Sequence, residues 1–145
     1  MRIRDILRTK GSEVITIEPE QSVLAAVKVL SEHRIGALVV RSGDDVVGII
    51  SERDVLNLTA RNPSRLEGIP VSEAMTANVI VGVPDDDLDY VMSIMTENRI
   101  RHLPIVDKSG GLLGMVSIGD VVGAVRQSIE AENRHLKDYI LGVVR

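Results

Sequence analysis

The segment that decides the fold is Gly-Ile-Ile-Ser-Glu-Arg-Asp at 48–54, which returns as Gly-Met-Val-Ser-Ile-Gly-Asp at 114–120. The Gly, Ser and Asp keep their places, and the offset between the two copies is 114 − 48 = 66 residues. Upstream of this segment the offset is 79 − 14 = 65, because Val-Ile at 14–15 recurs at 79–80. Matched residues in one order, interrupted by a single inserted residue, indicate an internal duplication.

Each copy carries the same series of predicted elements. A short apolar run leads through a Pro turn to an amphipathic helix, for which Ser22 and Asp87 are good N-caps. Two strands joined by a polar turn come next, and a second helix begins near Ser51 and Ser117. The strands are expected at 14–17, 37–40 and 46–50 in the first copy, and at 79–81, 103–106 and 112–116 in the second.

This series predicts an α/β (α+β) fold of two tandem β-α-β-β-α repeats with a long C-terminal helix. We expect a first repeat at 1–66, a second repeat at 67–127 and a helical extension at 128–145. The chain has 145 residues, of which 44% are hydrophobic, so it can bury a substantial core. Because Trp and Phe are absent, that core must be aliphatic.

Composition excludes several classes of function. Without Cys there is no thiol catalysis, disulfide or Cys-based zinc site. A net charge of −4 argues against binding to nucleic acid or to an anionic membrane. The N-terminus lacks the apolar stretch of a secretory signal, and no apolar run approaches a membrane span. We therefore expect a cytoplasmic protein.

The repeated strand-to-helix junction has the chemistry of a nucleotide site. A helix start offers free N–H groups and partial positive charge to a phosphate. The hydroxyls of Ser51 and Ser117 add a donor, and the carboxylates of Asp54 and Asp120 suit the two hydroxyls of a ribose. Ser-x-x-Asp at a helix start also resembles a capping box. The duplication does not separate these readings, because a cap would be copied as well.

Cationic side chains near the junctions differ between the repeats. Arg101 and His102 open the middle strand of the second repeat, where the first repeat has Gly36 and Ala37. Arg53 lies within the first junction, and Gly119 is its counterpart. Basic groups at these places suit a phosphate, so we expect two unequal clefts. If His102 binds as a cation, affinity should fall above its pKa, near 6.5 when unperturbed.

The sequence shows no catalytic constellation. The three histidines have no spacing typical of a metal site or a triad, and there is no Walker loop. The acidic run at 85–87 follows a Pro and is more typical of a helix start than of a metal site. We therefore predict no enzyme, no catalytic residues, no metal and no catalytic cofactor.

The C-terminal helical pattern carries an apolar stripe that must be covered. Either the stripe packs on its own domain or it meets a second copy of the chain. The helix outlasts the repeat unit, which favours a homodimer. The stripe consists of Val122, Val125, Ile129, Leu136, Ile140 and Val143.

Taken together, these motifs resemble a tandem pair of cystathionine β-synthase (CBS) domains, known as a Bateman module, of the free-standing type. The resemblance covers 2–125 and rests on the runs at 35–40, 48–54, 99–106 and 114–120 and on Met75-Thr76. It implies two units packed through their sheets about a pseudo-twofold axis, with two clefts. It also implies an adenosine ligand such as AMP, ADP, ATP, NAD(H) or S-adenosylmethionine.

The resemblance places the ribose-binding acid on Asp54 and Asp120 and a first-strand contact on Thr16, which Val81 replaces in the second repeat. The predicted nucleotide-binding residues are Thr16, Ile17, Gly36, Ala37, Ser51, Arg53, Asp54, Val79, Val81, Arg101, His102, Leu103, Pro104, Ser117 and Asp120. We expect an energy- or redox-sensing regulatory module that responds through the packing of a dimer and acts on an unknown regulated protein. The alternative is a dimerisation scaffold that binds no nucleotide, in which the Ser and Asp residues are only caps.

Overall fold

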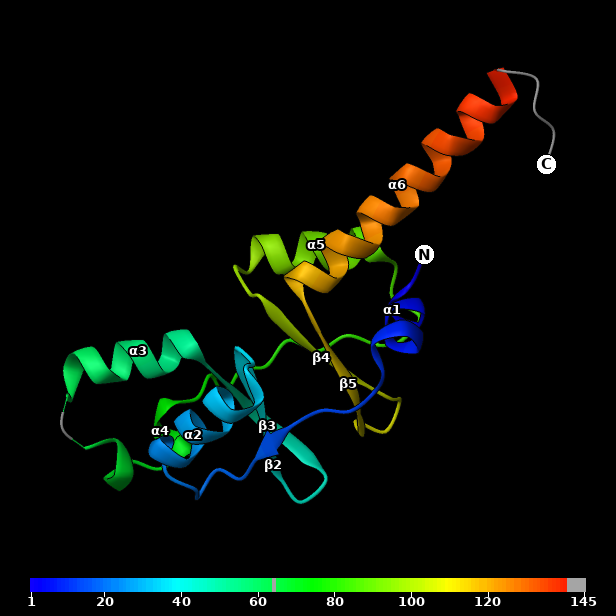
Figure 1. Cartoon of the computed structure of the whole chain (residues 1–145). Coiled ribbons are helices and arrows are strands. Elements are labelled where there is room, and N and C mark those ends of the chain that lie inside the picture. Colours follow the sequence, from blue (N-terminus) through cyan, green and yellow to red (C-terminus); the bar gives the residue numbers. More distant parts are fainter. Residues whose placement is uncertain (64, 141–145) are drawn as a thin grey trace.

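The computed structural model describes residues 1–63 and 65–140, apart from the side chains of residues 138 and 139. In the first repeat β1 (Thr16–Ile17), β2 (Ala37–Ser42) and β3 (Asp45–Ser51) form a sheet in that order, with β1 parallel and β3 antiparallel to β2. In the second repeat β4 (His102–Val106) and β5 (Leu112–Ser117) form an antiparallel pair. Figure 1 shows the two sheets side by side at the centre of the molecule.

Helices flank both sheets. The first repeat has α2 (Val23–His33) and α3 (Glu52–Arg61), and the second has α5 (Leu88–Glu97) and α6 (Ile118–Ile140). Shorter helices lie at the start of the chain and around the junction of the repeats: α1 (Ile3–Lys10), η1 (Leu66–Gly68) and α4 (Val71–Ala74). The predicted fold of two mixed repeats and a long C-terminal helix is confirmed.

Local geometry repeats along with the sequence. Arg34 and Arg99 are separated by the 65-residue offset, and both follow a helix in the left-handed conformation, with φ of 53° and 54°. Ser22 caps α2 as predicted, since its Oγ accepts the Ala25 N–H at 3.0 Å. Asp87 was expected to cap α5 in the same way, but its side chain makes no such bond. Its backbone instead pairs with Arg2, which brings the N-terminal segment to this helix start.

The predicted strand at 79–81 is wrong. Pairing occurs one residue later, where the Gly82 N–H donates to the Pro104 carbonyl and the Val106 N–H donates to the Gly82 carbonyl, both at 2.9 Å. The backbone at Gly82 lies so close to β4 that a Cβ on Gly82 would be 2.9 Å from a methyl group of Leu103. Val81 stays 44% exposed beside this single bridge, so the segment is too short to form a strand.

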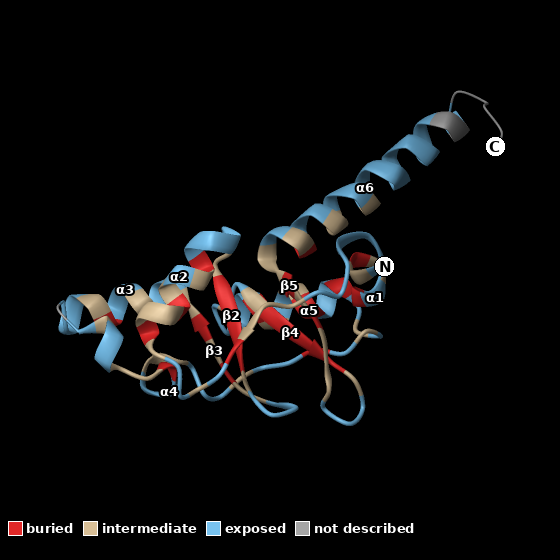
Figure 2. Cartoon of the chain, turned by 60° about the horizontal axis from the view of Figure 1, so that its bottom comes forward, coloured by how far each residue is buried: buried red, intermediate tan, exposed pale blue. Residues whose placement is uncertain are grey.

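Each hydrophobic core contains residues from the short helix near the start of the other repeat. Ile3 and Ile6 of α1 lie at the start of the first repeat but pack in the core of the second, with Val91 and Met95. Val71 of α4 lies near the start of the second repeat but packs in the core of the first. Figure 2 shows this buried material as red segments in the strands and on the inner helix faces. Ile3 and Val71 are fully buried, and burying such a side chain contributes about 1.5–3 kcal/mol, so the exchange interlocks the repeats.

Helix α6 starts against α5 and then projects from the body of the molecule (Figure 1). Val125 of its apolar stripe packs against the second core, but the outer members stay exposed in the described structure, with Ile129 52%, Leu136 57% and Ile140 79% exposed. Val143, the last member of the predicted stripe, lies outside the described residues. Within the described part of the chain, no helix combines the length and apolar character needed to cross a membrane.

Candidate functional site

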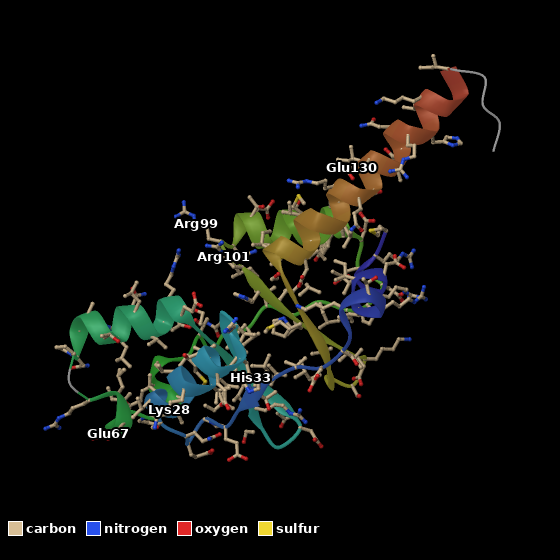
Figure 3. All side chains as sticks on the ribbon, viewed as in Figure 1. Lys28, His33, Glu67, Arg99, Arg101 and Glu130 are labelled. Carbon is tan, nitrogen blue, oxygen red and sulfur yellow. The ribbon has the colours of Figure 1, made fainter. Side chains whose placement is uncertain are left out.

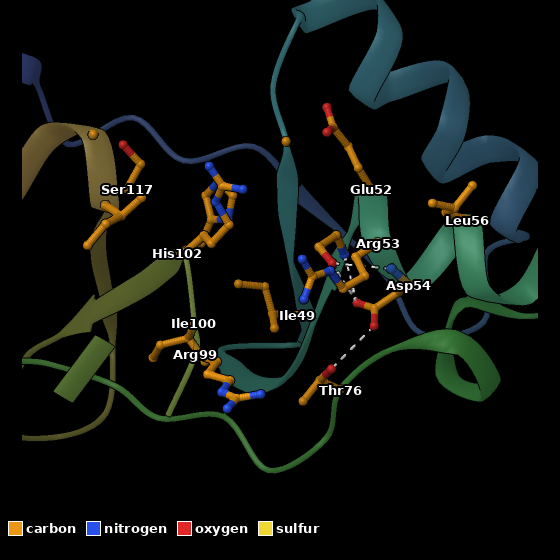
Figure 4. A pocket seen from close by; sticks show the side chains of 15 residues that line it. Ile49, Glu52, Arg53, Asp54, Leu56, Thr76, Arg99, Ile100, His102 and Ser117 are labelled. Atoms are coloured by element: carbon orange, nitrogen blue, oxygen red, sulfur yellow. Dashed lines mark hydrogen bonds between the residues drawn. The ribbon is translucent and has the colours of Figure 1, made fainter. Parts of the chain in front are cut away.

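A cleft of about 670 Å³ opens between the two repeats. Four segments form it: the β3–α3 junction, the chain at Thr76, the turn from α5 into β4, and the β5–α6 junction. In Figure 4 Asp54 and Thr76 lie on one side, while His102 and Ser117 lie on the other. The lining consists of Gly36, Ile49, Ser51, Glu52, Arg53, Asp54, Leu56, Thr76, Arg99, Ile100, Arg101, His102, Ser117, Ile118 and Gly119.

The first junction forms a capping box. The Asp54 N–H donates to Ser51 Oγ at 3.3 Å, and Asp54 Oδ2 accepts the Ser51 N–H at 2.9 Å and the Ser51 hydroxyl at 3.1 Å. Among the residues that the structure describes, the other carboxylate oxygen, Oδ1, accepts only a long 3.5 Å bond from the Thr76 hydroxyl. Capping and ligand binding are therefore compatible, because the box uses one oxygen and leaves Oδ1 in the cleft.

The second junction forms the same box and then departs from the first. The Ser117 N–H donates to Asp120 Oδ2 at 2.8 Å, and the Asp120 N–H donates to Ser117 Oγ at 3.1 Å. Lys10 of α1 also donates to Asp120 Oδ2, at 2.6 Å. Burial raises the pKa of Asp120, but the bonds from Lys10 and Ser117 outweigh it and hold that pKa below its ordinary value. Ser117 reaches the inter-repeat cleft, whereas Asp120 is absent from its lining.

Three arginines contribute to the cleft: Arg53, Arg99 and Arg101. Figure 3 shows Arg99 and Arg101 at the turn that leads from α5 into β4. Among the described residues, none of the three forms an ion pair. Arg34 has the same backbone geometry as Arg99 but lies outside the cleft. The arginines of the cleft thus come from both repeats, Arg53 from the first and Arg99 and Arg101 from the second.

His102 lies beside the glycine that opens the middle strand of the other repeat. A Cβ on Gly36 would approach the imidazole Cε1 and Nε2 to 3.3 Å, so only a small residue leaves this space open. Burial lowers the pKa of His102, Lys10 and Arg101 lower it further, and Glu52 and Asp120 oppose them. The environment of His102 therefore holds its pKa below the value of 6.5 that an unperturbed imidazole would have.

The structure divides the predicted site residues into two groups. Those that line the cleft are Gly36, Ser51, Arg53, Asp54, Arg101, His102 and Ser117. Those that do not are Thr16, Ile17, Ala37, Val79, Val81, Leu103, Pro104 and Asp120. Ile17, Ala37 and Leu103 are buried in the cores, where they support the cleft rather than face it.

Sequence reasoning left several lining residues out of the predicted site. Thr76 enters the cleft because its backbone pairs with Ile49, through N–H to O bonds of 3.0 and 2.9 Å. Its place directly after Met75, near the start of the second repeat, was the available signal. Arg99 was recognised as a cation but not assigned to the site, and its proximity to Arg101 was the signal for it. The apolar lining residues Ile49, Leu56, Ile100 and Ile118 gave no signal of their own.

The sequence matches the family description "CBS domain" twice, over residues 3–61 and 71–127. The chain belongs to the CBS domain family. It is 36% identical to the CBS domain-containing protein CBSX3, mitochondrial, of Arabidopsis thaliana, across 97% of this chain and 72% of that protein. The crystal structure of the CBS-domain protein ATU1752 from Agrobacterium tumefaciens is similar, with a TM-score of 0.82, 39% identity, and coverage of 86% and 98%.

A second solved structure is informative about ligands. The CBS domain pair of protein MJ0100 was crystallised in complex with 5'-methylthioadenosine and S-adenosyl-L-methionine. It matches this CBS pair with a TM-score of 0.78 and 28% identity, over 88% of this chain and 98% of that one. Both ligands of the MJ0100 pair contain an adenosine group.

Proposed function

We propose that this CBS pair binds one adenosine ligand in the cleft at Asp54 and acts as a regulatory sensor of that ligand. The observation that carries the proposal is the Asp54 carboxylate, which keeps Oδ1 in a cleft that also holds three arginines without ion pairs among the described residues. A carboxylate accepts two ribose hydroxyls, and guanidinium groups grip a phosphate. The adenosine ligands of the MJ0100 pair support the same class of ligand here.

The lining suits the three parts of an adenine nucleotide. Asp54 and Thr76 present polar groups for the ribose at one end of the cleft. The aliphatic side chains of Ile49 and Leu56 offer the apolar surface on which a flat base can pack, since no Phe, Tyr or Trp is among the described residues that line the cleft. The phosphates would then extend toward Arg99 and Arg101. This arrangement favours AMP, ADP, ATP or NAD(H) over an adenosine ligand without phosphate.

A ligand in this cleft bridges both repeats. Asp54 belongs to the first repeat and Arg101 to the second, so binding favours the relative placement of the repeats in which both reach the ligand. Helix α6 begins at Ile118, inside the cleft, and the shift would therefore reach the far end of α6. The size of the response is limited by the difference in ligand affinity between the two placements.

A homodimer would transmit this change in the placement of the repeats. A groove of about 410 Å³ between α5 and α6 is lined by Met92, Val122, Val125 and Ile129, with Arg126 and Glu130 among its residues. A second copy in antiparallel orientation, centred near residue 128, brings Arg126 opposite Glu130 in both directions and covers the exposed Ile129. A separate regulated protein, in the cytoplasm, would recognise the dimer.

Calorimetric titration with AMP tests the site and separates it from the scaffold alternative. Asp54→Asn keeps an oxygen for the Ser51 N–H but loses the carboxylate charge, whereas Asp54→Ala loses both the cap and the ribose contact. Hydrogen bonds to a charged group contribute about 1.5–3 kcal/mol each, so Asp54→Asn should weaken AMP binding at least tenfold. Only Asp54→Ala should also lose about 1 kcal/mol of stability as a cap. Unchanged affinity in both variants would favour the scaffold.

A further inference from the structure

The carboxylate of the second junction is already occupied by a side chain of the same protein. Lys10 Nζ lies 2.6 Å from Asp120 Oδ2 and 2.9 Å from the Met115 carbonyl oxygen, and donates a hydrogen bond to each. Lys10 is the last residue of α1, 110 residues before Asp120 in the chain. A charged donor thus stands on the acid that corresponds, by the 66-residue offset, to Asp54.

The helix that carries Lys10 is fixed to the second repeat. The Ile3 N–H donates to the Asp86 carbonyl at 3.0 Å, and the Arg4 N–H donates to the Pro84 carbonyl at 2.9 Å. Arg4 also pairs with Asp85. The base of the Lys10 side chain is therefore held in place, while the side chain itself stays 41% exposed and can rotate away. The contact is positioned by the fold but can open.

The first repeat has no equivalent of this contact. The counterpart of Lys10 at the 65-residue offset is Met75, whose side chain packs over Gly48 of β3. Among the described residues, the Asp54 carboxylate receives hydrogen bonds only from Ser51 and Thr76, and no cation pairs with it. One repeat thus presents its acid to a cleft, and the other covers its acid with Lys10.

We propose that Lys10 is a built-in occupant of the Asp120 site, so that the pair takes one adenosine ligand per chain, at Asp54, and Lys10 must leave before a second can bind. This inference rests on the proposed function for the site at Asp54. The Lys10 ammonium makes a charge-assisted bond to Asp120 Oδ2, the oxygen that also accepts the Ser117 N–H, so it lies against the carboxylate that a ribose would approach. A ligand at Asp120 would have to displace this ammonium and its second bond, to the Met115 carbonyl oxygen.

The test is the number of AMP molecules bound per chain, measured by calorimetry on the full chain and on Lys10→Met. Methionine is the residue that the first repeat has at the equivalent place, and it keeps the helix while removing the charge. The control is Lys28→Met on α2, an exposed position in the first repeat (Figure 3). We expect one AMP per chain for the wild type and for Lys28→Met, and two for Lys10→Met. Adding Asp120→Asn to Lys10→Met should return the number to one.

Each result bears on either Lys10 or the proposed function. One AMP for both the wild type and Lys10→Met overturns the role of Lys10 and leaves the Asp54 site standing, as does a wild type that already binds two. No AMP in the wild type but one in Lys10→Met supports the role of Lys10 and removes the Asp54 site. No AMP in either overturns both. A thermal melt of Lys10→Met within a few degrees of the wild type shows that the variant is folded.

Discussion

Replacing Gly48 by Ala should loosen the contact that places Thr76 in the cleft. A Cβ at Gly48 would lie 3.0 Å from Met75 Cγ and 3.0 Å from the Thr76 carbonyl oxygen, and closer still to the Met75 sulfur. The methionine side chain can turn aside. The carbonyl cannot do so at low cost, because it accepts the Ile49 N–H at 3.0 Å.

The expected loss of stability of Gly48→Ala follows from these contacts. Overpacking of this kind costs about 1–3 kcal/mol. The smaller chain entropy of Ala in the unfolded state offsets about 0.4–1 kcal/mol of that cost. The net destabilisation is about 1–2 kcal/mol, which lowers the Tm of a chain of this size by roughly 2–8 °C. AMP binding should weaken as well, since Thr76 lines the cleft.

The matched control is Gly114→Ala, at the same position in the second repeat. There a Cβ would meet only the end of the Leu7 side chain, with Cδ2 at 2.8 Å, and that end can rotate. Gly123→Ala, in α6 with nothing within 4 Å, should instead stabilise the protein by about 0.5–1 kcal/mol through helix propensity. Thermal unfolding followed by circular dichroism compares all three variants. Equal melting temperatures for Gly48→Ala and Gly114→Ala would refute the reasoning.

Two further predictions concern pH and assembly. The pKa of His102 is lowered in the free protein, and a bound phosphate favours the imidazolium, so AMP binding should take up a proton at His102. The affinity of the wild type for AMP should therefore rise relative to that of His102→Asn as the pH is lowered from about 7.5 to about 6. Parallel pH profiles in calorimetry would remove His102 from the phosphate site. The wild type should have a dimer mass in light scattering at micromolar concentration, and Ile129→Glu, which puts a charge in the α5–α6 groove, should be a monomer. A wild-type monomer would contradict the homodimer.

The duplicated sequence predicted the features that depend on neighbouring residues alone, namely the helices and their starts. Hydrophobic periodicity located the helices, and Ser51 with Asp54 marked a helix start that is both a cap and part of the cleft lining. The strand predicted at 79–81 failed because pairing depends on a partner, and the partner strand accepts only the backbone at Gly82.

Long-range features could not be read from local patterns. The exchange of α1 and α4 between the cores joins apolar residues from opposite repeats, and many other pairings would bury the same area. The Lys10–Asp120 contact joins residues 110 positions apart, and nothing near either residue indicates it. Arg34 and Arg99 follow their helices in the same conformation, yet only Arg99 reaches the cleft, which no local pattern distinguishes.

The most direct test of the adenosine site is a crystal structure of the protein grown with AMP. The ribose hydroxyls should lie about 2.5–3.0 Å from the Asp54 carboxylate, with the phosphate against Arg99 or Arg101 and Lys10 still on Asp120. AMP bound away from this cleft, or a cleft without AMP in which Asp54 bonds only to Ser51 and Thr76, would contradict the proposed site.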